Sequence, residues 1–226
     1  AVYEKLEQDL MVLTQYLWED IHKVRGLTRR LHRDHTLVHH SFNSGVMGLA
    51  LFGAMNAKAF TDGEMKRRTL DRLAIGMFIH DLGMTKIPIF IRKKEKVLTG
   101  DEKSKILQHP KLGYQMLSKL DLKYPEVEQC ALEHHERVNG KGYPQKLGQK
   151  DLGKYGRICA VGDAFAAMVT RRSYAEQKDP ITAAGELSQD NGFDANVTKT
   201  LQSMVMTQKH WKKMAEDIRK EKEKNS

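Results

Sequence analysis

The stretch DRLAIGMFIHDLG, residues 71–83, decides which fold the sequence predicts. Residues 71–81 have a strongly helical composition rich in apolar side chains, and Gly83 and Pro88 mark where the chain leaves that helix. His80 and Asp81 therefore lie next to each other at a helix end. A neighbouring imidazole and carboxylate in that position can both reach one metal ion, and the carboxylate can bridge two.

Helical patterns also cover most of the chain outside this stretch. Thr99 and Glu102 form a capping box that opens the helix leading to His109, and Pro110 ends that helix or begins the next one. The segment NGKGYP, residues 139–144, cannot continue a helix and is predicted to be a loop. No alternating strand pattern and no repeat occurs, so the predicted fold class is all-α. Further helices are expected over 40–60, 111–120, 125–136 and 158–170, with two more after Pro180 that are separated near Asn191 and Gly192.

The two ends of the chain carry different patterns. Apolar residues recur at three- and four-residue steps over the first thirty residues and predict one long helix, which either packs on its own domain or serves as a dimerising or signal-transmitting helix. The tail from Lys212 alternates Lys and Glu and is expected to fray into solvent. The predicted division is an N-terminal linker or dimerisation helix over 1–33, a catalytic domain over 34–210 and a charged tail over 211–226.

Composition limits the classes of function. The net charge of +9 favours an anionic partner, but no helix-turn-helix or basic–aromatic face supports DNA binding. No membrane-spanning stretch or signal peptide is present, and two cysteines without a CxxC pattern suit reduced thiols, so we expect a cytoplasmic protein. The chain begins with Ala1 rather than Met, so we expect it to be part of a longer signalling protein. The basic run from Arg92 to Lys96 is predicted to be a solvated loop.

Further candidate metal ligands lie near other predicted helix ends. His134 and His135 form a second adjacent pair just before the glycine-rich loop, and His40 and His109 add two imidazoles. Neutral imidazoles with a few carboxylates suit iron, manganese or zinc rather than magnesium or calcium. The remaining histidines are not assigned to metals: His22, His32, His35, His39 and His210.

The order of these motifs resembles the HD-GYP branch of the HD phosphohydrolases over about residues 40–193. The matching segments are His40-Ser41, His80-Asp81-Leu82-Gly83 with Ile87-Pro88, Leu98-Thr99 before His109-Pro110 with Gly113, His134-His135-Glu136-Arg137 with Gly140-Lys141-Gly142-Tyr143-Pro144, Ala160-Val161-Gly162-Asp163, and Arg172-Ser173-Tyr174. The resemblance implies an HD-type helical bundle, here with an additional N-terminal helix.

The resemblance also implies a two-metal centre with iron or manganese, bridged by Asp81. Family members hydrolyse cyclic di-GMP to linear pGpG or to GMP through a metal-bridged hydroxide, so His80 and Asp81 are expected in the catalytic centre. Glu136 and Arg137 are expected to support the ligands, with Glu136 holding a ligand imidazole. A signalling partner is expected to bind the loop that contains Gly140, Gly142, Tyr143 and Pro144. The implied ligands are His40, His80, Asp81 and Asp163 for one ion, and Asp81, His109, His134 and His135 for the other.

The sequence departs from the family pattern at several positions. Thr36 stands where members with a third ion have a carboxylate, which predicts two ions rather than three. Met84 replaces a phosphate-binding Lys, with Lys86 two residues further on, while Arg172 keeps a substrate-binding role without the Lys usually found at 175. Ala166 also replaces an Asp that is common in the family. We expect a working cyclic-dinucleotide phosphodiesterase with altered substrate handling; the alternatives are a weak or inactive receptor of the cyclic dinucleotide and a hydrolase of another nucleotide.

Overall fold

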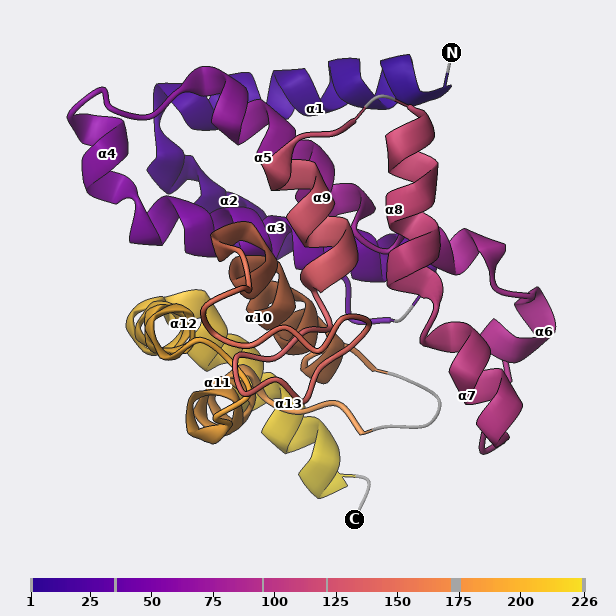
Figure 1. Ribbon diagram of the computed structural model, residues 1–226. Coiled ribbons are helices and arrows are strands. Elements are labelled where there is room, and N and C mark those ends of the chain that lie inside the picture. The colour runs from indigo at the N-terminus through magenta and orange to yellow at the C-terminus, as the bar shows by residue number, and fades with distance from the viewer. Residues whose placement is uncertain (1, 35, 95, 121, 172–175, 225–226) are drawn as a thin grey trace.

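The computed structural model describes residues 2–34, 36–94, 96–120, 122–171 and 176–224. The described residues form helices joined by turns and loops, without a β-strand among them (Figure 1). This confirms the predicted all-α class. The α-helices are α1 (Val2–Glu19), α2 (Val24–Leu27), α3 (Leu37–Met55), α4 (Ala57–Thr61), α5 (Arg67–Ile79), α6 (Ile89–Arg92), α7 (Gly100–Ile106), α8 (His109–Lys119), α9 (Pro125–Glu133), α10 (Lys154–Met168), α11 (Pro180–Gln189), α12 (Ala195–Thr207) and α13 (Lys209–Lys224), and the short 3-10 helices are η1 (Ile21–Lys23), η2 (Thr28–Arg30) and η3 (Leu82–Lys86).

Local signals in the sequence explain several helix boundaries. Thr99 accepts a hydrogen bond from the backbone of Glu102, and the Glu102 side chain accepts one from the backbone of Thr99, so the predicted capping box at α7 is confirmed. Pro110 lies in the first turn of α8, where a missing N–H costs little, and it therefore begins that helix. The segment between α9 and α10 is a loop, as its glycines and proline predicted.

Helices α3 and α10 cross closely at the centre of the molecule. A Cβ atom on Gly162 would lie only 3.0 Å from the backbone nitrogen of Gly48 and 3.3 Å from the carbonyl oxygen of Ser44. The missing side chains let the two backbones approach. Because His40 lies earlier on α3 and Asp163 directly follows Gly162, the crossing brings these two side chains to the same place.

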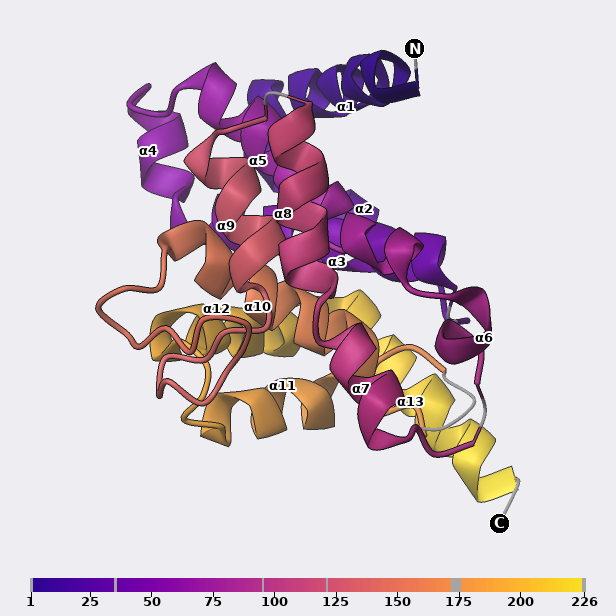
Figure 2. The same cartoon turned by 45° about the vertical axis from the view of Figure 1, so that its right-hand side comes forward.

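The N-terminal segment is not the single long helix that the sequence predicted. Helix α1 ends at Glu19, and Asp20 then caps η1 by accepting a hydrogen bond from the backbone of His22. The chain turns there, since Asp favours a cap over a helix interior. Helix α1 crosses one end of the bundle and packs against α5 (Figures 1 and 2).

The apolar face of α1 packs against the rest of the chain. This agrees with the first of the two predicted roles, a helix packed on its own domain. Leu10 and Leu17 are buried. A homodimer through this helix stays a prediction and would use the outer face, where Met11, Val12 and Tyr16 are exposed. The division into a linker over 1–33 and a domain over 34–210 also stays a prediction.

The C-terminal segment is ordered as a helix rather than frayed, so that expectation is wrong as far as residue 224. Helix α13 places Trp211, Ala215 and Ile218 in the core at helical spacing, and its Lys and Glu residues cover the opposite side. The alternating charges concealed this apolar stripe. No helix in the described part of the chain is both long and apolar enough to span a bilayer.

Candidate metal centre

Five helical segments meet in one buried site. His40 lies in α3, His80 and Asp81 follow α5, His109 begins α8, His134 and His135 follow α9, and Asp163 lies in α10. All are buried except His135, which is half-buried. The structure therefore brings together all seven residues that the sequence singled out. His39, which neighbours His40, instead stacks on His32 at 4.0 Å between ring centroids.

Glycine 83 lets the segment after Asp81 lie directly against α8. A Cβ atom at this position would overlap the carbonyl oxygen of His109 and would come within 2.5 Å of the backbone nitrogen of Gly113. Because backbone atoms cannot move aside as a side chain can, this position requires glycine. The contact places Asp81 next to His109.

Three of the imidazoles are oriented by backbone carbonyl groups. The Nδ1 atom of His80 donates to Met77 O at 2.9 Å, that of His109 to Ile106 O at 2.7 Å, and that of His134 to Cys130 O at 2.9 Å. A carbonyl oxygen can only accept, so Nδ1 carries the proton in each ring and Nε2 offers a lone pair when the ring is neutral. This is the arrangement that metal-binding histidines commonly have.

The sequence contained a signal for these carbonyl partners that our reading missed. Each partner lies three or four residues before its histidine, within one helical turn. The expectation that Glu136 holds a ligand imidazole is wrong. Its buried carboxylate instead accepts hydrogen bonds from three backbone nitrogens of the following loop, at Gln145, Lys146 and Leu147.

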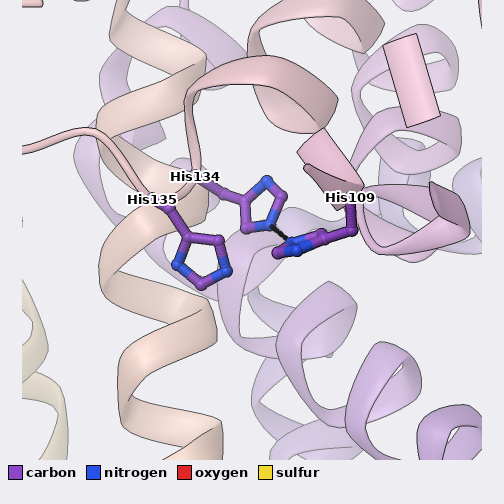
Figure 3. Close-up of side chains that lie close together, drawn as sticks. All are labelled: His109, His134 and His135. Atoms are coloured by element: carbon purple, nitrogen blue, oxygen red, sulfur yellow. Dashed lines mark hydrogen bonds between the residues drawn. The ribbon is translucent and has the colours of Figure 1, made fainter. Parts of the chain in front are cut away.

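The Nε2 atoms of His109 and His134 approach to 3.0 Å, and the ring of His135 completes this group of three (Figure 3). Burial lowers the pKa of His134 well below its usual value and that of His135 to about 4, so both rings are neutral at pH 7. With Nδ1 of each ring held by a carbonyl group, the two Nε2 atoms at this distance are placed to share one cation. This observation fits a metal ion.

A second group contains His40, His80 and Asp163. The Oδ1 atom of Asp163 lies 2.7 Å from Nε2 of His40 and 3.7 Å from Nε2 of His80. Nε2 of His80 is buried and has no hydrogen-bond partner among the described residues. Burial would raise the pKa of Asp163, but the histidine contacts outweigh it and hold this pKa well below its usual value. The group thus offers an ionised carboxylate and an unused ring nitrogen.

Asp81 lies between the two groups and faces both. Its Oδ1 atom is 3.2 Å from Nε2 of His109 and 3.8 Å from Nε2 of His134, while its Oδ2 atom is 3.9 Å from Nε2 of His40. Its pKa is also lowered: burial would raise the pKa of Asp81, but the close contact with His109 and the charges of the neighbouring imidazoles prevail. Buried negative charge on both aspartates favours cations at this site.

The glycine-rich loop closes one side of the site. Tyr143 stacks on His135, with ring centroids 4.7 Å apart and planes inclined by 19°. The Arg137 side chain donates to the carbonyl oxygens of His134 and Glu136 and lies over the ring of Phe193. Gly140, Gly142 and Pro144 lie in the part of the loop between Glu136 and the backbone nitrogens that Glu136 binds.

A cavity of 480 Å³ opens beside the site. His135, Arg137 and Asp163 line its inner end, and its wall continues along α10 and α11. Lys86 is exposed in η3 and does not line this cavity. Arg172 and Ala175 lie outside the described residues, so the predicted substrate contact of Arg172 stays a prediction. Thr36, the position considered for a third ion, caps α3 by accepting a hydrogen bond from the backbone of His39.

A model of the HD domain family matches residues 26–197, a region that holds all seven site residues. The chain belongs to the HD domain family. Its fold is similar to that of the HDG"Y"P protein Bd1817 from Bdellovibrio bacteriovorus, with a TM-score of 0.68 at 17% identity over 90% of this chain and 63% of that one. The family match confirms the HD family that the sequence resemblance implied, and the structural likeness confirms the HD-type helical fold.

Curated relatives are more similar in sequence, over shorter segments of the chain. The chain is 36% identical to a cyclic di-GMP phosphodiesterase of Thermotoga maritima over 115 residues, which are 50% of this chain and 31% of that protein. It is 38% identical to the cyclic di-GMP phosphodiesterase response regulator RpfG of Xanthomonas campestris over 99 residues, 43% of this chain and 26% of that protein. It is 35% identical to the 3'3'-cGAMP-specific phosphodiesterase 2 of Vibrio cholerae over 105 residues, 46% of this chain and 20% of that protein. The matched segments thus span about a third or less of these relatives.

Proposed function

We propose that this HD domain is a metal-dependent phosphodiesterase that hydrolyses cyclic di-GMP to linear pGpG or onward to GMP. One observation carries the proposal: imidazoles whose Nδ1 atoms are held by carbonyl groups direct their Nε2 atoms toward two buried carboxylates. The activities named for the relatives above support the choice of a cyclic dinucleotide as substrate.

The site suits two divalent transition-metal ions, iron or manganese. His40, His80, Asp81 and Asp163 would hold one ion, and Asp81, His109, His134 and His135 the other, with Asp81 shared because its two oxygens face the two groups. Two such ions would supply a nucleophile from water at neutral pH and neutralise charge on the phosphoryl oxygens.

The chain's own residues provide the binding surface for the substrate. The cavity beside the site has the Arg137 guanidinium in its wall, next to the proposed metal ligands His135 and Asp163. A cyclic dinucleotide carries two phosphate charges, which Arg137 and the proposed metal ions would attract, while Glu186 and Asp190 in the same wall would oppose them. The stacking of Tyr143 on His135 would hold that imidazole beside His109 and His134.

The proposal is tested by metal analysis and a product assay on the full chain, loaded with iron or manganese under reducing conditions. Cyclic di-GMP, cyclic GMP-AMP, cyclic di-AMP and linear pGpG form the substrate panel. We expect about two ions per chain and hydrolysis of cyclic di-GMP.

A matched pair of variants links the activity to the site. Asp81→Asn removes the shared carboxylate charge and should lower both metal content and turnover, the latter by at least about a hundredfold. Asp62→Asn, at an exposed position, should change neither. Binding of cyclic di-GMP by the loaded protein without any product would instead favour a receptor, and turnover of other nucleotides alone would favour a different phosphohydrolase.

A further inference from the structure

Three large apolar side chains are exposed in α6 and shortly after it, and none of them lines the cavity beside the metal centre. Ile89, Phe90 and Val97 are exposed to 57%, 68% and 93%, although they lie within nine residues of one another. We call these three side chains the α6 tip. The figures show α6 at the edge of the molecule in both views (Figures 1 and 2). Exposure of several large apolar side chains in one short segment is a sign of an interaction surface.

Basic residues predominate in the segment that contains the α6 tip. Residues 86–105 contain seven Lys and Arg against three Asp and Glu. Lys86, Lys93 and Lys96 are exposed and form no ion pair with any described residue. The segment therefore combines exposed apolar side chains with a net positive charge.

The segment holds its shape through other contacts, which leaves this surface free. Lys94 forms two hydrogen bonds with the carboxylate of Glu102, at 2.8 and 2.6 Å, and Arg92 Nε donates to the carbonyl oxygen of Ile87 at 3.0 Å. Ile91 is buried beneath the turn. The two inward basic residues and Ile91 thus fix the turn that presents the α6 tip.

We propose that the α6 tip binds the surface of a lipid bilayer that contains anionic headgroups. Apolar side chains at a membrane interface sit among the upper acyl chains while neighbouring lysines contact the anionic headgroups. A convex tip of three side chains suits a fluid interface, which needs no shape complementarity. A stable protein partner would require a surface of roughly 800 Å² on each side.

Sedimentation of the full chain with vesicles tests this proposal. We expect binding to vesicles of phosphatidylcholine with about 30% phosphatidylglycerol, and weak binding to phosphatidylcholine alone, with a decline at high salt. The charge variant Lys93→Glu/Lys96→Glu should weaken binding by at least about 25-fold, since each lysine near such a surface contributes about fivefold. The matched variant Lys212→Glu/Lys213→Glu changes the net charge equally on the exposed side of α13 and should bind nearly as well as the parent chain.

The apolar contribution has its own pair of variants. Phe90→Ser should weaken vesicle binding about tenfold or more, whereas Val12→Ser, at an equally exposed position on α1, should not. The fluorescence of Phe90→Trp should shift to shorter wavelength on anionic vesicles and should be quenched by brominated lipid. Absence of vesicle binding by the parent chain, or equal loss in the α6 and α13 charge variants, would overturn the proposal. Undiminished vesicle binding by both Lys93→Glu/Lys96→Glu and Phe90→Ser would also overturn the proposal.

Discussion

Single residues decide whether the ligand-bearing segments can meet. Gly83 is the clearest case, because its neighbours are backbone atoms of α8 that cannot turn aside. The spacing between each histidine and its carbonyl partner is the second case. The Nδ1 atom of the histidine donates to a carbonyl oxygen three or four residues earlier in the chain. Most of the orientation of the imidazoles is therefore local, while their convergence depends on close backbone contacts.

The substitution Gly83→Ala should destabilise the protein by about 1–3 kcal/mol or more, since a new Cβ would force η3 away from α8. It should also lower the metal content, because Asp81 and His109 would separate. Gly185→Ala is the matched control: it lies inside α11 with no atom within 4 Å of a Cβ, and it should stabilise by about 0.5–1 kcal/mol. Denaturant unfolding measures both changes. Equal effects from the two variants would contradict the account.

At the scale of elements, one carboxylate holds the loop that flanks the site. Glu136 is 1% exposed and accepts from the backbone nitrogens of Gln145, Lys146 and Leu147 at 2.5, 3.1 and 3.0 Å. A loop with few apolar contacts depends strongly on such bonds.

Glu136→Gln should therefore loosen the loop, because the amide keeps only one acceptor oxygen and turns a donor toward backbone N–H groups. We expect faster hydrogen exchange at the amides of residues 145–147 and a loss of about 2 kcal/mol in unfolding free energy. Glu64→Gln, at an exposed position, should leave both unchanged. Unaltered exchange at 145–147 in the Glu136 variant would show that other contacts hold the loop.

The carboxylate of Asp194, at the start of α12, contributes to the free energy of unfolding in a way that depends on pH. Asp194 accepts hydrogen bonds from the backbone of Asn196 and Val197 and forms an ion pair with Arg157 at 2.9 Å. Although burial raises the pKa of Asp194, the bond from Arg157 and the backbone donors lower it below its usual value. Its contribution is present above about pH 4 and is lost as the pH falls through the lowered pKa.

Asp194→Asn keeps a good helix cap but removes the charge. The variant should be less stable than the parent by about 1–2 kcal/mol at pH 7, since a largely buried charge-assisted hydrogen bond from Arg157 becomes a neutral one. This difference should shrink as the pH falls below about 4, because protonation then removes the same charge from the parent. Thermal unfolding at several pH values checks this. A difference that stays constant from pH 7 to pH 3 would exclude the charge as its cause.

At the scale of the whole molecule, α13 completes the core. The Trp211 ring is fully buried and meets Phe165 of α10 edge-on, with centroids 5.5 Å apart and planes at 83°. Helix α10 also carries Asp163, so the C-terminal helix supports an element of the metal centre.

Trp211→Ala should cost about 3–5 kcal/mol, because it leaves a large cavity in the core, and should lower Tm by roughly 6–20 °C. Trp211→Phe should cost clearly less, since Trp211 Nε1 has no hydrogen-bond partner among the described residues. Lys212→Ala, on the exposed side, should have little effect. Thermal unfolding of the three variants measures these changes. A Tm of Trp211→Ala equal to that of Lys212→Ala would refute the role of α13 in the core.

The sequence by itself determined the all-α class, the α7 capping box, the loop after His135 and six of the seven candidate ligands, while the family resemblance supplied Asp163. Each of these depends on residues close in the chain, such as Thr99 with Glu102 or the pair His80 and Asp81, whose chemistry and spacing are visible without a fold. The HD resemblance added the order of the motifs, and the family match confirmed it.

Only the tertiary structure decided how distant segments meet. It placed the two oxygens of Asp81 toward different groups of histidines, turned Glu136 toward its loop and buried Trp211. A side chain's direction at a helix end depends on which backbone it packs against, here through Gly83 and Gly162. Burial of an apolar stripe depends in turn on a partner surface far away in sequence. Local spacing fixes which groups are available, and close packing fixes what they face.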